Sequence, residues 1–155
     1  MCNDGIMVRI TEYGNLAEKK VFSYLKKTNK DVFLHGTEGY HFPFGDIQVG
    51  KNIETCKIYE VKGQSEDNNS KTKWDVPRKS IKISTTEYKF LKNFPNRFFI
   101  CIVYRLKYNK NPKWNIPKMA ICKGIDLVKL KPKRRAVHLI TPNDYWKKST
   151  QVLVK

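Results

Sequence analysis

Three charged residues in the stretch 44–63, FGDIQVGKNIETCKIYEVKG, have types and spacing suited to phosphate chemistry. Asp46 precedes Glu60 by 14 residues, and Lys62 follows Glu60 by two. Because side chains alternate between the two faces of a strand, Glu60 and Lys62 should project from the same face. If Asp46 lies on the neighbouring strand, two carboxylates and one ammonium group meet. That set is the minimum needed for metal-assisted cleavage of a phosphodiester.

The expected chemistry explains these residue types. Mg²⁺ takes oxygen ligands and retains several waters, so Asp46 and Glu60 together with substrate phosphate would suffice to hold it, and Mn²⁺ can substitute. The bound ion polarises a phosphoryl oxygen and lowers the pKa of a coordinated water. Lys62 would orient that water or offset charge on phosphorus. The alternative is a hairpin with an ordinary exposed Glu–Lys pair, since this short pattern also arises by chance in a lysine-rich chain.

The charge of the chain points to a polyanionic partner. Its 155 residues include 31 Lys and Arg against 14 Asp and Glu, a formal net charge of +17. Residues 105–155 alone carry 14 basic and two acidic residues, a net +12. Such self-repulsion favours nucleic acid as partner, whereas a membrane surface is not expected because no basic stretch has an apolar stripe. Charge alone does not distinguish a nuclease from a ribosomal or architectural protein.

The cysteines and the lack of apolar segments indicate a reduced, soluble, intracellular protein of the cytoplasm or nucleus. There is no C-x-x-C motif, and Cys56 and Cys101 lie in strand-like runs where buried free thiols are usual. No Cys/His set has the spacing of a zinc site. We expect no membrane span and no signal peptide, because the chain has no run of about 18 apolar residues and its start is polar.

The first half of the chain predicts one helix followed by three strands. Apolar residues recur at helical spacing from Asn15, a plausible N-cap, to Lys27. Short strands are expected at 31–34, 47–49 and 55–61, the last two forming a hairpin around the turn at 50–52.

The second half predicts a helix, a buried strand and an irregular basic tail. The polar segment 64–79 should be a loop, and Ser84 with Glu87 forms a Ser-x-x-Glu capping box. Residues 97–104 are the most apolar run and should be a central strand. Beyond them, short apolar runs (119–122, 127–130 and 136–140) alternate with basic links.

This order of elements resembles the PD-(D/E)XK, or restriction-endonuclease-like, nuclease superfamily. That superfamily often carries a glutamate on its first helix, where this chain has Glu18. The segments 84–94 and 97–104 resemble a branch related to the C-terminal domain of plant NO VEIN proteins, and archaeal Holliday-junction resolvases share much of the order. The resemblance covers about residues 15–106. Phe44-Gly45 precedes Asp46 where the superfamily usually has Pro-Asp, which affects only the turn.

The resemblance implies an α/β fold with a mixed central sheet flanked by helices. It implies a single nuclease-like domain over 1–155, with a core at 15–106 and a basic C-terminal extension at 107–155. The implied activity is Mg²⁺-dependent endonucleolytic hydrolysis, of DNA rather than RNA, in restriction, repair or junction processing. Asp46 and Glu60 would hold the metal, Lys62 would support the attacking water, and Glu18 would be a further catalytic residue.

A homodimer is expected, because two chains most simply cut two strands. Two alternatives stay open. One is a nucleic-acid-binding protein that retains the fold without cutting, and the other is an unrelated basic structural protein.

Two basic segments are candidates for gripping nucleic acid. The loop interleaves an aromatic residue with cations, and the tail holds five cations in residues 129–135. A solvated surface is the simpler explanation for each, but phosphate contact and base stacking suit these compositions. Gln64 either extends the polar site or begins the loop, and His41 is more readily a structural histidine than a phosphate contact. The expected contacts are Lys71, Lys73, Trp74, Arg78, Lys79, Lys131, Lys133, Arg134 and Arg135.

Overall fold

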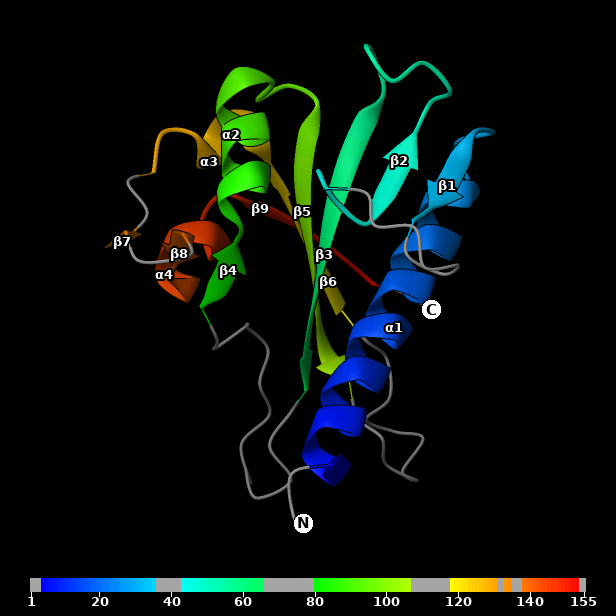
Figure 1. Ribbon diagram of the computed structural model, residues 1–155, viewed down its shortest axis with the longest axis vertical. Coiled ribbons are helices and arrows are strands. Elements are labelled where there is room, and N and C mark those ends of the chain that lie inside the picture. Colours follow the sequence, from blue (N-terminus) through cyan, green and yellow to red (C-terminus); the bar gives the residue numbers. More distant parts are fainter. Residues whose placement is uncertain are drawn as a thin grey trace.

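A computed structural model describes residues 4–35, 43–65, 80–106, 118–130, 133–134 and 138–153 of the chain (Figure 1). The helices are α1 (Asp4–Lys26), α2 (Thr85–Asn93), α3 (Gly124–Leu127) and α4 (Pro142–Trp146). The strands are β1 (Val32–Leu34), β2 (Ile47–Val49), β3 (Lys57–Ser65), β4 (Ile81–Ile83), β5 (Phe98–Leu106), β6 (Lys118–Lys123), β7 (Lys133–Arg134), β8 (His138–Ile140) and β9 (Ser149–Leu153).

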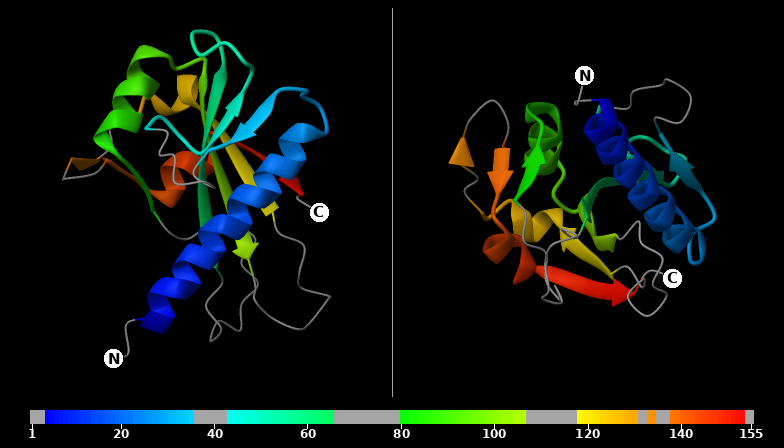
Figure 2. Two further views of the ribbon diagram at one scale, coloured as in Figure 1. Left: turned by 45° about the vertical axis from the view of Figure 1, so that its right-hand side comes forward. Right: turned by 90° about the horizontal axis from the view of Figure 1, so that it is seen from below.

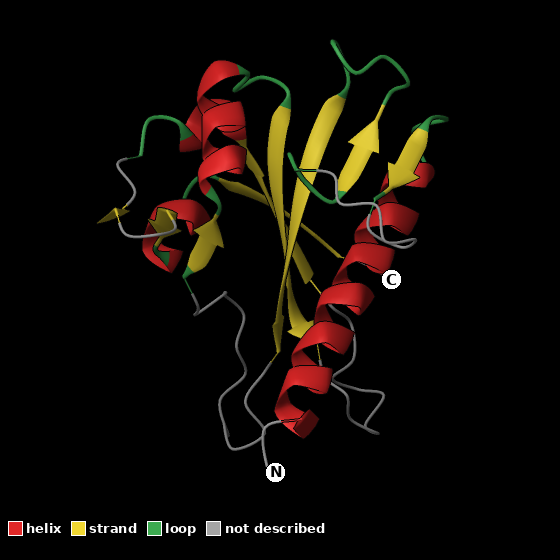
Figure 3. Cartoon of the chain, viewed as in Figure 1, coloured by secondary structure: helices red, strands yellow, loops and turns green. Residues whose placement is uncertain are grey.

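A six-stranded mixed sheet forms the centre of the molecule, in the order β1-β2-β3-β5-β6-β9. Strands β3 and β5 are parallel, and the other neighbours in this sheet are antiparallel. Helices flank the sheet (Figure 3). The predicted fold class, an α/β fold with a mixed central sheet between helices, is therefore confirmed.

The two faces of the sheet carry separate apolar clusters. Figure 2 shows helix α1 on one side of the sheet and helices α2 and α4 on the other. Alternate residues of β3 point to opposite faces, as the pleat of a strand requires. Tyr59 and Val61 pack with Ala17 and Val21 of α1 on one face. Ile58 belongs to the cluster on the other face, which α2, α4 and the smaller sheet help to build. Glu60 and Lys62 follow Ile58 in the same alternation, so they belong to the second face.

The smaller sheet has three antiparallel strands in the order β4-β8-β7. Ile81 and Ile83 of β4 and Ile140 of β8 are buried in the cluster that includes α2. This sheet therefore supports α2, and the Ser84 cap follows directly after β4.

The first helix starts earlier than expected. It begins at Asp4 rather than at Asn15, so Asn15 lies inside the helix and does not cap it. The residues before Asn15 contain no proline, and an interior glycine such as Gly14 costs about 1 kcal/mol without ending a helix. The predicted end at Lys27 agrees to within one residue.

The C-terminal third is not the irregular tail that the sequence suggested. Strand β6 pairs with β5, and β9 pairs with β6, so the central sheet takes in strands from beyond residue 106. The physical reason lies in β5, because a buried strand must satisfy backbone hydrogen-bonding groups along both of its edges. The apolar run 119–122 lies in β6, which pairs with the second edge of β5.

Other predicted elements are confirmed. The 31–34 strand, the 47–49 and 55–61 hairpin and the central 97–104 strand correspond to β1, β2 with β3, and β5. Strand β3 continues to Ser65, so Gln64 belongs to the strand and not to a loop, while residues 66–79 lie outside the described ranges. Cys56 and Cys101 are buried free thiols, as expected. In the ranges given above, no helix is both long and apolar enough to cross a membrane.

Candidate active site

Asp46 stands immediately before β2, at the mouth of the β2–β3 hairpin. The hairpin register pairs Ile47 with Tyr59, so Asp46 falls beside Glu60. The Asp46 backbone N–H donates a hydrogen bond to the Tyr59 carbonyl at 3.0 Å. Its carboxylate oxygen Oδ2 accepts a hydrogen bond from the Val61 backbone N–H at 2.7 Å. These contacts hold the Asp46 carboxylate against β3. The hairpin therefore brings Asp46 and Glu60 together although they are 14 residues apart in the sequence.

Gly45 permits this close approach of the chain to β3. A Cβ atom at position 45 would lie 2.6 Å from the Cγ2 atom of Ile58 and 3.2 Å from the Tyr59 carbonyl oxygen. Ile58 is fully buried, so it has little room to move away. A glycine before Asp46 is therefore a steric requirement.

Glu60 and Lys62 form a partly buried ion pair on one face of β3, as their two-residue spacing predicted. The Lys62 Nζ atom lies 2.5 Å from Glu60 Oε1, and Glu60 is only 5% exposed. Burial raises the pKa of Glu60 to about 8, although the Lys62 charge lowers it and Asp46 raises it further. Burial alone would lower the pKa of Lys62, but the charge and hydrogen bond of Glu60 outweigh it and the net direction is upward. The pair is therefore not an ordinary exposed one.

Glu18 of α1 lies within electrostatic reach of the same groups. Burial raises the pKa of its half-buried carboxyl group to about 7. The Asp46 charge raises this pKa further, and the Lys62 charge lowers it. The long first helix thus brings a third carboxylate toward the hairpin, at the position that the resemblance singled out.

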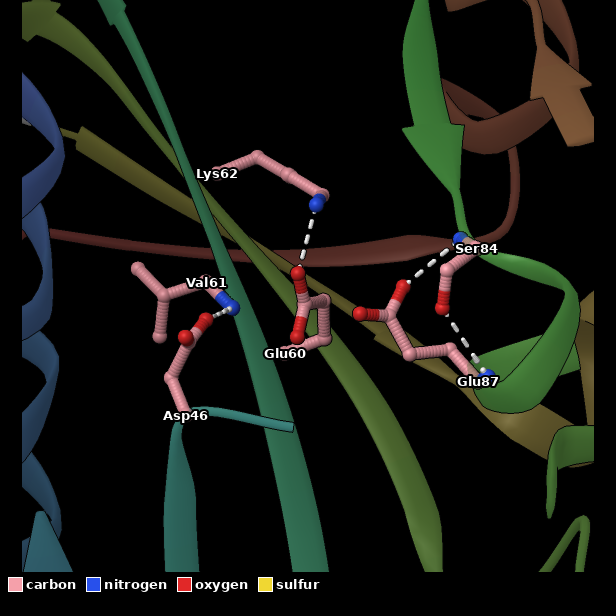
Figure 4. Close-up of polar contacts among 6 residues, drawn as sticks. All are labelled: Asp46, Glu60, Val61, Lys62, Ser84 and Glu87. Atoms are coloured by element: carbon pink, nitrogen blue, oxygen red, sulfur yellow. Dashed lines mark hydrogen bonds and ion pairs between the residues drawn. The ribbon is translucent and has the colours of Figure 1, made fainter. Parts of the chain in front are cut away.

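A fourth acid, Glu87, belongs to the capping box that the sequence predicts at the start of α2. That box is present: the Glu87 N–H donates to Ser84 Oγ at 3.2 Å, and the Ser84 N–H donates to Glu87 Oε2 at 2.9 Å. Figure 4 shows the Glu87 carboxylate directed toward Glu60 across the face of β3. Its charge raises the pKa of both Glu60 and Lys62. The Ser-x-x-Glu motif located this residue in the sequence, but only the packing of α2 places it beside the ion pair.

The charges of Asp46, Glu60 and Glu87 therefore all act on the Lys62 ammonium group, and Glu18 interacts with Asp46 and Lys62 from α1. Such a set suits a hard divalent cation, which takes oxygen ligands and offsets the repulsion between acids. Within the residues that the structure describes, no group of three or more His, Cys, Asp or Glu side chains is arranged to hold a metal ion. A fit with Mg²⁺ therefore relies on Asp46 and Glu60, with water and substrate phosphate as the remaining ligands.

The other expected site residues fall in different places. Gln64 is buried on β3, and its Nε2 donates a hydrogen bond to the Tyr145 hydroxyl of α4 at 3.2 Å. Lys133 and Arg134 form β7, at the edge of the smaller sheet. Five expected contacts in the loop, two in the tail and the histidine expected to be structural lie outside the described ranges: Lys71, Lys73, Trp74, Arg78, Lys79, Lys131, Arg135 and His41.

Comparison with known proteins gives a structural neighbour but no sequence relative. No protein-family model matches the chain, and no curated protein sequence matches it. Among solved structures, the chain is similar to Hjc, a Holliday junction resolvase from the archaeal hyperthermophile Archaeoglobus fulgidus. The match has a TM-score of 0.47 and 17% sequence identity, and it covers 86% of this chain and 93% of the other. The roles proposed below for individual residues therefore rest on the side chains of this chain and not on this match.

Proposed function

We propose that this protein is a divalent-metal-dependent endonuclease that hydrolyses phosphodiester bonds in DNA. The observation that carries this proposal is the position of its acids. The chain holds only 14 Asp and Glu against 31 Lys and Arg, yet four of these acids interact electrostatically with one partly buried lysine, Lys62. Acids that lie close together repel one another, and this repulsion helps to raise their pKa values. Such perturbed pKa values concentrate where chemistry or ion binding occurs, so they indicate a functional site.

Each residue has a role in this proposal. Asp46 and Glu60 would hold the metal ion, which supplies Lewis acidity toward phosphate and lowers the pKa of a bound water. In the hydrolysis, a water oxygen attacks phosphorus, the bond to the leaving oxygen breaks, and that oxygen takes up a proton. The Lys62 ammonium group orients the water or offsets the negative charge that builds up on the phosphoryl oxygens. Glu18, with a pKa near neutrality, is suited to accept a proton from the water.

The substrate is DNA in this proposal, on the resemblance described for residues 15–106. The net charge of +17 supplies sequence-independent attraction to a phosphate backbone. We further propose a homodimer, because two sites cut two strands most simply, and a role in restriction, repair or junction processing.

A non-catalytic DNA-binding protein is the second candidate. The observation that favours it is the direct contact between Lys62 and Glu60, at 2.5 Å, which engages one of the proposed metal ligands. In that case the ion pair would be part of the scaffold, and the charge of the protein would serve binding alone.

Cleavage of DNA separates these two functions. Purified protein is incubated with supercoiled plasmid and with a branched DNA in Mg²⁺, Mn²⁺ or EDTA, beside the Asp46→Ala variant. The matched control is Asp31→Ala, because Asp31 pairs only with exposed Lys51 at 3.7 Å in the contacts described. A nuclease cuts with metal, loses cutting in Asp46→Ala and retains it in Asp31→Ala. Tight binding without any metal-dependent cutting supports the second candidate.

A further inference from the structure

An aromatic pocket of about 550 Å³ lies between α2 and the β2–β3 hairpin. Its walls include Phe44, Phe90 and Phe94, together with Ile53 and Ile58. Ile53 is 52% exposed and Phe94 is 44% exposed, so apolar surface opens to solvent here. The volume lies within the range of pockets that bind small organic groups.

The pocket adjoins the candidate active site. Phe44 precedes Asp46 by two residues, and Ile58 precedes Glu60 by two residues on the same face of β3. Along α2, the lining runs from Thr86, next to Glu87, to the C-cap residue Phe94. At a rise of 1.5 Å per residue, that distance is about 12 Å. One end of the pocket is therefore next to the acids, and the other lies about two helical turns away.

Arg97 holds the far end of the pocket in place. Its Nε atom donates to the Cys56 carbonyl at 2.8 Å, and its Nη2 atom donates to the Ile53 carbonyl at 2.6 Å. The guanidinium carbon also lies 4.9 Å from the ring centroid of Phe94 and 5.4 Å from that of Phe90. These contacts tie the hairpin turn to α2, so the walls are formed before any ligand arrives.

We propose that the aromatic pocket receives an unpaired nucleobase of the DNA that the adjacent site cuts, an inference that rests on the proposed function. Aromatic and apolar walls accept the flat face of any base, because stacking does not depend on sequence. Two cations, Lys89 and Arg97, line the pocket with one carboxylate, Glu54, and the excess of positive charge complements the phosphates on either side of such a base. An apolar side chain of a protein partner would not need these cations beside a phosphate-handling site.

A pocket for an unpaired nucleobase predicts which DNA structures the protein should prefer. A base inside an intact duplex is stacked and paired, so placing it in a pocket requires energy that a base already unpaired does not need. Forks, junctions, flaps and mismatches should therefore bind better than continuous duplex.

The test is a binding measurement in EDTA, where no metal-dependent cutting takes place. Three DNAs of equal length are compared: a continuous duplex, a fork with 2-aminopurine as its unpaired base, and the same fork with an abasic site at that position. The variants are Phe94→Ala and Phe33→Ala. Phe33 is the matched control, since it is a 40% exposed aromatic residue on β1, outside the pocket lining.

We expect the wild type to bind the 2-aminopurine fork most tightly and to quench its fluorescence. Phe94→Ala should weaken binding to that fork by roughly five- to a hundredfold, the range for loss of one base–aromatic stack, and should abolish the quenching. Binding to the duplex and to the abasic fork should change little. Phe33→Ala should behave as the wild type with all three DNAs.

Two results would overturn the pocket assignment while leaving the nuclease proposal intact. One is equal wild-type binding to the base-containing and abasic forks. The other is an equal loss with all three DNAs in Phe94→Ala, which would mean that Phe94 acts only by packing on Arg97. If the wild type binds none of the DNAs, the proposed function fails together with the pocket.

Discussion

Replacing Glu18 by glutamine should make the protein more stable at alkaline pH and leave its stability at acid pH almost unchanged. Burial and the Asp46 charge raise the pKa of Glu18 from 4.5 to about 7 in the folded protein. The folded state therefore holds this proton more tightly than the unfolded chain does. The stability that the protonated group contributes is fully present below about pH 4.5 and is lost as the pH rises through about 7. Glutamine cannot ionise, so the variant avoids this loss.

The size of the effect follows from the shift in pKa. The rise in the pKa of Glu18 from 4.5 to about 7 corresponds to about 3.5 kcal/mol, at about 1.4 kcal/mol per pKa unit. The side chain is half-buried, so screening by solvent reduces the expected gain to about 1–2 kcal/mol. For a domain of this size, each kcal/mol shifts the Tm by about 2–4 °C. Glu18→Gln should therefore melt about 3–6 °C above the wild type at pH 8, and within about 1–2 °C of it at pH 5.

The assay is thermal unfolding in metal-free buffer with EDTA, at pH 5, 6, 7 and 8, by circular dichroism. Glu54→Gln is the control, because Glu54 is an exposed carboxylate in the β2–β3 turn and stays in water in either state. Its Tm should follow that of the wild type at every pH. A Glu18→Gln variant that is less stable than the wild type at pH 8 would contradict a raised pKa of Glu18, since the attraction of Lys62 would then outweigh burial and the repulsion of Asp46.

Three further predictions concern the supports of the site and the charge of the chain. Ser84→Ala removes one half of the capping box and should cost about 1 kcal/mol, seen as a Tm lower by about 2–4 °C; an unchanged Tm would contradict the role of the cap. Gly45→Ala should destabilise the fold by about 1–3 kcal/mol in urea unfolding and slow cutting, because the new methyl group meets Ile58 next to Asp46. The control is Gly14→Ala in α1, where the added methyl group meets no atom within 4 Å. This control should stabilise the protein by up to about 1 kcal/mol. Equal effects at the two positions would contradict the steric explanation. Binding to duplex DNA should weaken steeply between 50 and 200 mM salt, and a flat salt dependence would argue against phosphate contacts as the source of affinity.

Local pattern in the sequence was sufficient to predict much of the fold. The alternation in β3 placed Glu60 and Lys62 on one face, and the Ser-x-x-Glu motif located the start of α2. Both features depend on residues a few positions apart, where backbone geometry decides the outcome. The apolar run that became β5 was also recognised, because a strand buried on both faces needs no alternation.

The features of the fold and site that the sequence did not predict depend on contacts between residues distant in sequence. Strand β6 looks like one of several short apolar runs, and only its pairing with β5 shows that it belongs to the central sheet. Glu87 satisfies its local capping pattern fully, so nothing nearby indicates that it faces Glu60. The aromatic pocket likewise combines Phe44, Phe90 and Phe94, which are brought together by the packing of α2 on the hairpin.

Whether the acids near Lys62 form a metal-dependent phosphodiesterase site is tested by the single-turnover rate of plasmid cutting in Mn²⁺. The wild type is compared with Lys62→Ala, and DNA binding is measured in the same samples. We expect metal-dependent cutting by the wild type, and a rate at least about a hundredfold lower in the variant with binding largely retained. Equal rates in the two proteins, or tight DNA binding by a wild type that never cuts, would contradict it.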